Sequence, residues 1–198
     1  MGLGQDVPVC PIMVGADGRN RQRLDARFSV FPQVIRKEVD VTQPLPEMGE
    51  FDIIINAAAP ADPASFAMQP VQVMLANIMG THHVLQYAVK HGRPVVLQIS
   101  SGEVYGSFLG ERIVTENDQG IVPILSPRSC YPMGKRAAET LCSSYIAQYG
   151  MDVRIARPSH VFGPGFTDSD SRVSADFFRL ALRGQDIVLK SDGIQRRT

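Results

Sequence analysis

Short apolar runs alternate along the chain with longer segments in which apolar residues recur every three or four positions. The short runs are typical of buried strands, and the longer segments are typical of helices with one apolar stripe. The predicted strands cover residues 7–14, 34–38, 52–56, 94–100, 153–157 and 187–189. The predicted helices cover residues 71–91, 131–149 and 174–183. This alternation predicts an α/β fold with a mostly parallel, doubly wound sheet that has helices on both faces.

Two long polar stretches, residues 110–128 and 158–171, separate predicted elements and are expected to form surface loops. In open α/β folds, the loops at the carboxyl ends of the strands carry the ligand site. Candidate chemistry is therefore expected in these stretches and in the turns directly after the strands.

Composition narrows the classes of partner. Twenty Lys and Arg residues balance 20 Asp and Glu residues among 198. Zero net charge argues against a general binder of nucleic acid or of anionic membranes. No apolar run reaches the roughly 18 residues that a membrane span needs, and the first residues do not resemble a signal peptide. Three cysteines without paired spacing give no support to a metal site and fit a reducing, cytoplasmic compartment.

Tyr131 and Lys135 are four residues apart on a predicted helix and therefore share a face. A nearby ammonium group stabilises a phenolate, so this pair can make tyrosine a general base. The spacing alone is a weak signal, because a core tyrosine followed by a surface lysine gives the same pattern.

A second candidate is the segment that begins with Ser100, Ser101, Gly102 and Glu103, directly after an apolar strand. It places a hydroxyl group and a carboxylate at the carboxyl end of that strand. Taken alone, serine and glycine after a strand most often form only a turn.

In this order, the segments resemble the extended short-chain dehydrogenase/reductase family, which contains the NAD-dependent nucleotide-sugar epimerases and dehydratases. The resemblance runs from about residue 12 to residue 198 and implies a Rossmann-like fold. Further matching motifs are Asp-Val at 40–41, Asn-Ala-Ala-Ala at 56–59, Asn-Ile-Met-Gly-Thr at 77–81, Arg-Pro at 157–158, Phe-Gly-Pro at 162–164 and Gly-Ile-Gln-Arg-Arg at 193–197.

The resemblance implies NAD as the cofactor. Asp17 would bind the adenosine ribose, although it can also be a turn residue, and Arg19 nearby leaves NADP open. The residues expected to contact the cofactor are Asp17, Asp40, Val41, Ala57, Ala58, Ala59, Asn77, Ser100, Tyr131, Lys135 and Pro158.

The implied reaction begins with oxidation of a nucleotide sugar to a 4-keto sugar. Tyr131, as a phenolate, would take the proton of the 4-hydroxyl group while the hydride of C4 passes to NAD⁺. Lys135 would lower the pKa of Tyr131 and hold the nicotinamide ribose. Ser101 would hydrogen-bond the reacting oxygen, and Glu103 would complete the catalytic set.

Glu103 separates the branches of this family. Simple 4-epimerases usually lack a carboxylate at that position, whereas dehydratases and decarboxylases have one. Gly102 stands where a dehydratase carries its acidic residue, and residues 127–131 resemble the Pro-Arg-Ser-x-Tyr segment of the decarboxylases. The resemblance therefore favours an enzyme like the UDP-glucuronate decarboxylases, with a 4-epimerase, a 4,6-dehydratase or a reductase of non-sugar ketones as alternative enzymes.

Substrate contacts are expected from Glu103, His160, Arg172 and Arg197. Guanidinium groups bind phosphate oxygens in pairs, which suits a UDP-linked substrate. His160 replaces the family's usual asparagine and can instead be structural. The family also commonly dimerises through two long helices, here residues 71–91 and 131–149, so a homodimer is expected.

The glycine-rich phosphate loop of dinucleotide-binding folds is missing from this sequence. Residues 7–14 match the second strand of the family's sheet, so the first strand and its loop are expected to be absent. Residues 1–165 would form an incomplete NAD-binding domain, and residues 166–198 the start of the substrate-binding part. Two hypotheses follow: a segment of a longer, active enzyme, or a truncated, non-catalytic binding or dimerisation module.

Overall fold

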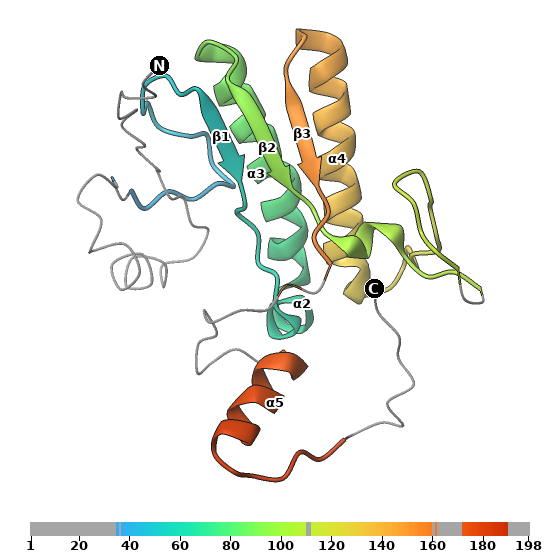
Figure 1. Cartoon of the computed structure of the whole chain (residues 1–198). Helices are drawn as coiled ribbons and strands as arrows, with labels where there is room; N and C mark the ends of the chain where they lie inside the picture. The colour runs from blue at the N-terminus through green and yellow to red at the C-terminus, as the bar shows by residue number, and fades with distance from the viewer. Residues whose placement is uncertain (1–34, 36, 110–111, 160, 162–171, 190–198) are drawn as a thin grey trace, which may run out of the picture.

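A parallel three-stranded sheet forms the centre of the computed structural model, which describes residues 35, 37–109, 112–159, 161 and 172–189 (Figure 1). Strands β1 (Ile53–Asn56), β2 (Val95–Ile99) and β3 (Val153–Ala156) lie side by side in chain order. Both neighbouring pairs are parallel. This arrangement confirms the prediction of a parallel α/β sheet.

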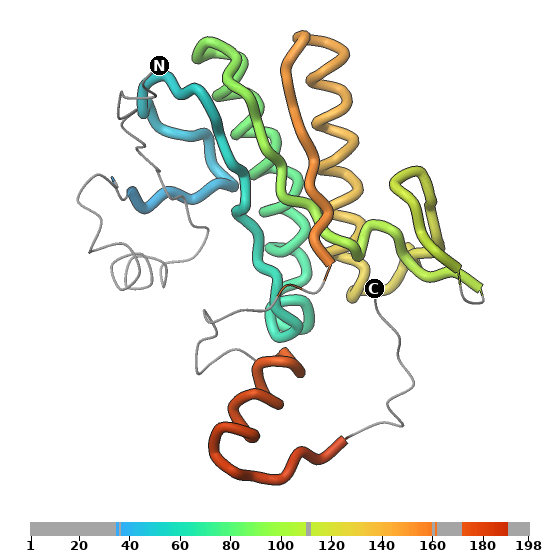
Figure 2. The backbone as a smooth tube through the Cα atoms, in the orientation of Figure 1, coloured from blue at the N-terminus to red at the C-terminus, as the bar shows by residue number. Residues whose placement is uncertain are grey.

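Helices α3 (Pro70–Lys90) and α4 (Cys130–Tyr149) connect the strands and lie together against one face of the sheet (Figure 1). Short elements gather at the end toward which the strands point: helix α2 (Pro63–Met68) and the 3₁₀ turns η1 (Gly102–Tyr105) and η2 (Pro127–Ser129). Helix α5 (Val173–Leu182) lies beyond that end. Figure 2 shows how the chain runs outward after η1 and comes back to the start of α4.

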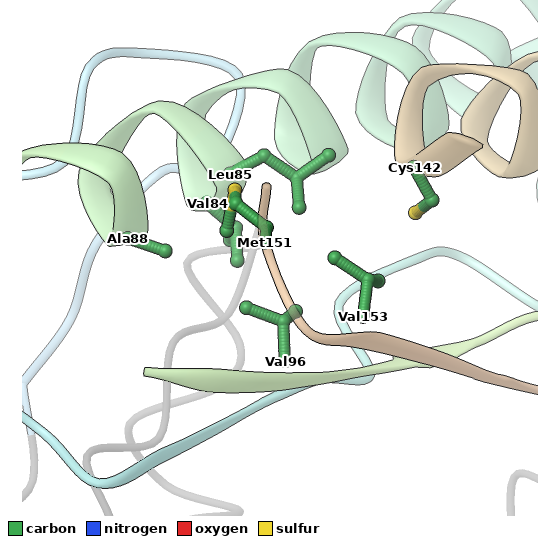
Figure 3. Close-up of a cluster of buried hydrophobic side chains, with 7 residues drawn as sticks. All are labelled: Val84, Leu85, Ala88, Val96, Cys142, Met151 and Val153. Carbon is green, nitrogen blue, oxygen red and sulfur yellow. The ribbon is translucent and has the colours of Figure 1, made fainter. Parts of the chain in front are cut away.

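The described core lies between the sheet and these two helices. Figure 3 shows Val96 and Val153 pointing from the sheet toward the helices. The cluster consists of Val84, Leu85, Ala88, Val96, Cys142, Met151 and Val153. On the opposite face, Ile53 and Ile55 are each 63% exposed, so the described residues cover only one face of the sheet.

Local sequence explains where the helices begin and end. Asp62 caps α2 by accepting a hydrogen bond from the backbone N–H of Ser65, and Pro63 occupies the first turn. Helix α4 ends at Gly150, which has a left-handed φ of 65°. The sequence analysis missed α2, although the Asp-Pro pair is a recognisable start signal.

Two predicted strands are wrong. Residues 35, 37 and 38 of the predicted strand 34–38 and all of residues 187–189 lie outside any strand. Apolar residues become a strand only where a neighbouring strand pairs with them, and Ile187, Val188 and Leu189 are instead exposed. The predicted strand at residues 7–14 lies outside the described residues.

Candidate active site

All four predicted catalytic residues lie near the carboxyl end of β2. Ser101 and Glu103 belong to the turn η1 that directly follows β2, with Ser101 as its N-cap. Tyr131 and Lys135 lie in the first two turns of α4. The loop after β3 joins them, because the backbone N–H of Gly102 donates to the carbonyl of Pro158 at 2.8 Å.

Tyr131 is buried, and its ring stacks on that of Phe66 with 4.7 Å between centroids. Burial raises the pKa of its hydroxyl, and the negative charge of Glu103 acts in the same direction. A hydrogen bond with Ser101 and the positive charge of Arg128 oppose this rise in pKa. Tyr131 is therefore a protonated phenol at neutral pH, and the expected lowering of its pKa by Lys135 is not found, because burial outweighs the charges around the hydroxyl.

Lys135 is also buried, and its Nζ donates to the carbonyl of Ile99 at 2.8 Å. The same Nζ lies 5.7 Å from the centre of the Tyr131 ring. Burial lowers the pKa of Lys135 to about 8, although the charge of Glu139 opposes this. Two N–H groups of the ammonium have no hydrogen-bond partner among the described residues, so they can bind a ligand.

Glu103 is paired with Arg128, a residue to which the sequence analysis gave no role. Arg128 Nη2 donates to both carboxylate oxygens, at 2.9 and 3.1 Å. The guanidinium carbon lies 4.6 Å from the centre of the Phe66 ring, which also stacks on Tyr131. An ion pair and two stacked rings thus form one continuous group beside the Tyr131 hydroxyl.

The half-buried carboxylate of Glu139 connects the residues after two strands to α4, and the sequence did not predict this role. Ser100 Oγ donates to Glu139 Oε1 at 2.5 Å, and Arg157 donates to both carboxylate oxygens at 2.9 and 2.7 Å. These contacts tie the residues after β2 and β3 to α4. The signal was present in the spacing, because Glu139 lies one helical turn beyond Lys135.

Asn77 packs against α4 from α3. Its Nδ2 donates to the carbonyl of Val73 at 2.8 Å, whereas its buried Oδ1 has no partner among the described residues. A Cβ atom at Gly134 would lie 3.1 Å from Asn77 Cβ, so the glycine permits this close approach. Asn77 therefore presents an unused acceptor beside the site helix.

The other predicted cofactor contacts lie before and after β1. The Asp40 carboxylate accepts from the backbone N–H and the hydroxyl of Thr42, and Val41 is fully buried. The Asn56 side chain accepts from the N–H of Ala58 at 3.3 Å and so shapes the turn formed by Ala57, Ala58 and Ala59. Cofactor contacts by these residues stay predictions.

The predicted substrate residues are only partly described. Arg172 is the N-cap residue of α5 and is exposed. Asp17, His160 and Arg197 lie outside the described residues.

The described residues show no metal centre and no membrane span. Nowhere among them do three His, Cys, Asp or Glu side chains come together as a metal ion requires. None of the helices in this part of the chain combines the length and the apolar character needed to cross a membrane.

Comparison with known proteins places this site in a family context. The sequence model of the NAD dependent epimerase/dehydratase family matches residues 9–198. UDP-glucuronic acid decarboxylase 6 of Arabidopsis thaliana is 39% identical over 159 residues, which are 80% of this chain and 45% of that protein. UDP-glucuronic acid decarboxylase 1 of Xenopus tropicalis is 36% identical over 160 residues, 80% of this chain and 37% of that protein. The chain thus spans less than half the length of these curated relatives.

Solved structures show the same fold. A double mutant of dTDP-glucose 4,6-dehydratase from Streptomyces venezuelae, with NAD and DAU bound, matches 92% of this chain and 55% of its own, with a TM-score of 0.75 and 26% identity. UDP-glucuronic acid 4-epimerase from Bacillus cereus, in complex with NAD, matches 93% of this chain and 58% of its own, with a TM-score of 0.71 and 20% identity. The second likeness shows the fold alone.

Proposed function

Because the chain belongs to the NAD-dependent epimerase/dehydratase family, we propose that its site converts a nucleotide sugar through a 4-keto intermediate, as a UDP-glucuronate decarboxylase does. The observation that carries this proposal is the Glu103 carboxylate beside Tyr131 and Ser101. This set is expected for a decarboxylase, and the similarity to UDP-glucuronic acid decarboxylases supports it.

The described residues fit the nicotinamide end of NAD. Lys135 keeps two N–H donors for ribose hydroxyl groups, and the buried Oδ1 of Asn77 is an unused acceptor nearby on the packed helix. Residues 1–165 would supply this NAD-binding part, and residues 166–198 would begin the part that binds the sugar nucleotide. Bound NAD⁺ would supply the hydride acceptor at C4 of the sugar.

The chain's own residues then handle the proton and the orientation of the sugar. Tyr131 would act as the phenolate, after releasing its own proton to solvent. Its phenolic oxygen would then receive the proton of the 4-hydroxyl group and return it when the ketone is reduced. Ser101, which acts on the pKa of the Tyr131 hydroxyl, would orient the same sugar oxygen. Lys135 would hold the ribose and, as an ammonium group, favour the phenolate.

Two alternatives within the family lead to different products. A 4,6-dehydratase needs an acid where this chain has Gly102, which disfavours that reaction. A 4-epimerase would return the hydride to the other face of the sugar and keep the carboxylate. The family assignment together with the complete Tyr131, Lys135 and Ser101 set favours an enzyme over a non-catalytic module.

Product analysis separates these reactions. The chain is incubated with NAD⁺ and UDP-glucuronate that is labelled at the carboxyl carbon, with Tyr131→Phe as the matched control. We expect labelled CO₂ and a UDP-pentose from the wild type, and a loss of about 100-fold or more in Tyr131→Phe because the proton carrier is gone. UDP-galacturonate as the only product would establish the epimerase instead. Failure to bind NAD⁺ in a titration would favour the non-catalytic module.

We also propose a homodimer through α3 and α4 in the cytoplasm. Val71, Leu75 and Ile146 are exposed apolar residues on these two helices, and a four-helix bundle would cover such side chains. Cys130 and Cys142 are free thiols, as a reducing compartment allows. Light scattering would test the dimer: Leu75→Glu should lower the measured mass to that of one chain, and an unchanged mass would exclude this interface.

A further inference from the structure

We propose that Arg128 selects an acidic sugar by binding the substrate's carboxylate with the N–H groups that Glu103 leaves unused. The inference rests on the proposed function for the class of ligand, a nucleotide sugar. It adds the residue that distinguishes a sugar acid from a neutral sugar.

Arg128 has more hydrogen-bond donors than Glu103 uses. A guanidinium group carries five N–H donors. Arg128 binds both oxygens of Glu103 through Nη2 alone, at 2.9 and 3.1 Å. The N–H groups on Nε and Nη1 have no hydrogen-bond partner among the described residues. Arg128 can therefore bind a second carboxylate without releasing Glu103.

Arg128 also lies next to the aromatic group that includes Tyr131. The Arg128 guanidinium lies 4.6 Å from the centre of the Phe66 ring, and that ring stacks on Tyr131 at 4.7 Å. Arg128 also belongs to η2, the turn that leads directly into α4 and Tyr131. Its charge is close enough to act on the Tyr131 hydroxyl. A carboxylate bound by Arg128 would thus lie beside the group that reacts with the sugar.

The neighbouring arginines differ from Arg128 because more of their nitrogen atoms bind oxygens of the protein itself. Arg136 donates to the carbonyls of Val104 and Gly120, at 2.7 and 2.8 Å. Arg157 is occupied by Glu139 and by the carbonyl of Glu116. Their guanidinium groups hold the protein's own oxygens in place. Arg128 is 54% exposed at its side chain, so a solute can reach it.

The balance of charges at the site also favours an acidic ligand. Glu103 by itself would repel an anionic sugar from the space beside Tyr131. Arg128 offsets that charge, and its unused donors supply directed hydrogen bonds to an incoming carboxylate. The Arg128–Glu103 pair thus allows a catalytic carboxylate to lie next to a substrate that is also negatively charged.

The test compares two ligands that differ at C6, UDP-glucuronate and UDP-glucose, by calorimetric titration of the full chain in the presence of NAD⁺. Arg128→Gln should weaken UDP-glucuronate binding by about tenfold or more, because charge-assisted hydrogen bonds are lost. UDP-glucose binding should stay unchanged, and Arg128→Lys should restore part of the preference.

Arg112→Gln is the matched control. Arg112 is likewise paired with a carboxylate, that of Asp118, and its guanidinium carbon lies 4.9 Å from the centre of the Phe108 ring. Arg112 belongs to the loop between η1 and η2. We expect the Arg112→Gln variant to bind UDP-glucuronate and UDP-glucose with unchanged affinity.

Two results would overturn the inference: a wild-type chain without preference for UDP-glucuronate, or an equal loss for both ligands in Arg128→Gln. Failure of the proposed function looks different. Formation of UDP-galacturonate without CO₂ would exclude the decarboxylase while leaving the preference for an acidic sugar in place.

Discussion

Two arginine–carboxylate pairs lie at the same end of the sheet and differ in burial. In the pair Arg157–Glu139 the side chains are 24% and 12% exposed, whereas in Arg128–Glu103 they are 54% and 36% exposed. The buried pair connects the residue after β3 to α4 and also holds Ser100 after β2. The exposed pair connects only η1 and η2. Arg157–Glu139 thus belongs to the framework that positions Tyr131 and Lys135. Arg128–Glu103 lies at the surface, where a ligand can reach it.

Burial decides how much each ion pair contributes to the stability of the protein. In the interior, two charges stabilise each other only while both are present, and removing one leaves the other without compensation. Hydrogen bonding to Glu139 raises the pKa of Arg157 above its usual value, so the guanidinium stays charged. At the surface, water replaces a lost partner, and the ion pair adds little to stability.

The largest expected effect comes from removing one member of the buried pair. Glu139→Leu should lower the free energy of unfolding by about 3 kcal/mol, because it leaves the half-buried Arg157 guanidinium without its anion. Urea unfolding at neutral pH measures this. The double variant Glu139→Leu/Arg157→Met should recover most of the loss, and Asp152→Asn, from the exposed pair with Arg154, is the control. Equal losses in the single and double variants would contradict an uncompensated charge as the cause.

The next largest effect is the pH dependence of stability that comes from Lys135, which lies one turn before Glu139. Burial lowers its pKa to about 8, from 10.5 for an exposed lysine. Between these two values the unfolded chain binds a proton that the folded chain has lost, so stability from this group rises with pH. Relative to Lys135→Met, the wild type should gain about 3 kcal/mol over this window.

Urea unfolding at several pH values measures this difference. Cys142, whose pKa is raised by burial to about 12, has the opposite pH dependence, but both variants carry it and its contribution cancels. In a Glu139→Gln background the window should begin at lower pH, because the charge that supports the ammonium group is gone. Parallel curves for wild type and Lys135→Met would contradict a lowered pKa.

The regular framework could be predicted from sequence because its signals are local. The apolar stripes of α3 and α4 and the short runs of β1, β2 and β3 are contained within each element. Helix α2 has only six residues, too few to show a period. The wrong strand at residues 187–189 shows the limit of local signals, because a strand depends on a partner elsewhere in the chain.

The site shows the same division. Tyr131 and Lys135 were found because helical spacing places them on one face, and Ser101 because it follows a strand. Arg128 is 25 residues from Glu103 in sequence, and Arg157 is 18 residues from Glu139. Packing of separate elements brings these pairs together, and no local sequence pattern predicts such contacts. The spacing of Glu139 after Lys135 could have drawn attention to the carboxylate but not to its partners.

The smallest expected effect on the stability of the protein comes from breaking the exposed pair. Loss of the ion pair in Arg128→Gln should by itself change the free energy of unfolding by no more than about 0.5 kcal/mol, because Glu103 stays in contact with water. The guanidinium also leaves the face of the Phe66 ring, a stacking contact that contributes a similar amount at an exposed position. Urea unfolding beside Glu139→Leu measures both pairs on one scale. A loss above about 2 kcal/mol would place Arg128 in the framework with Glu139, and the comparison between a structural pair and a ligand-accessible pair would no longer hold.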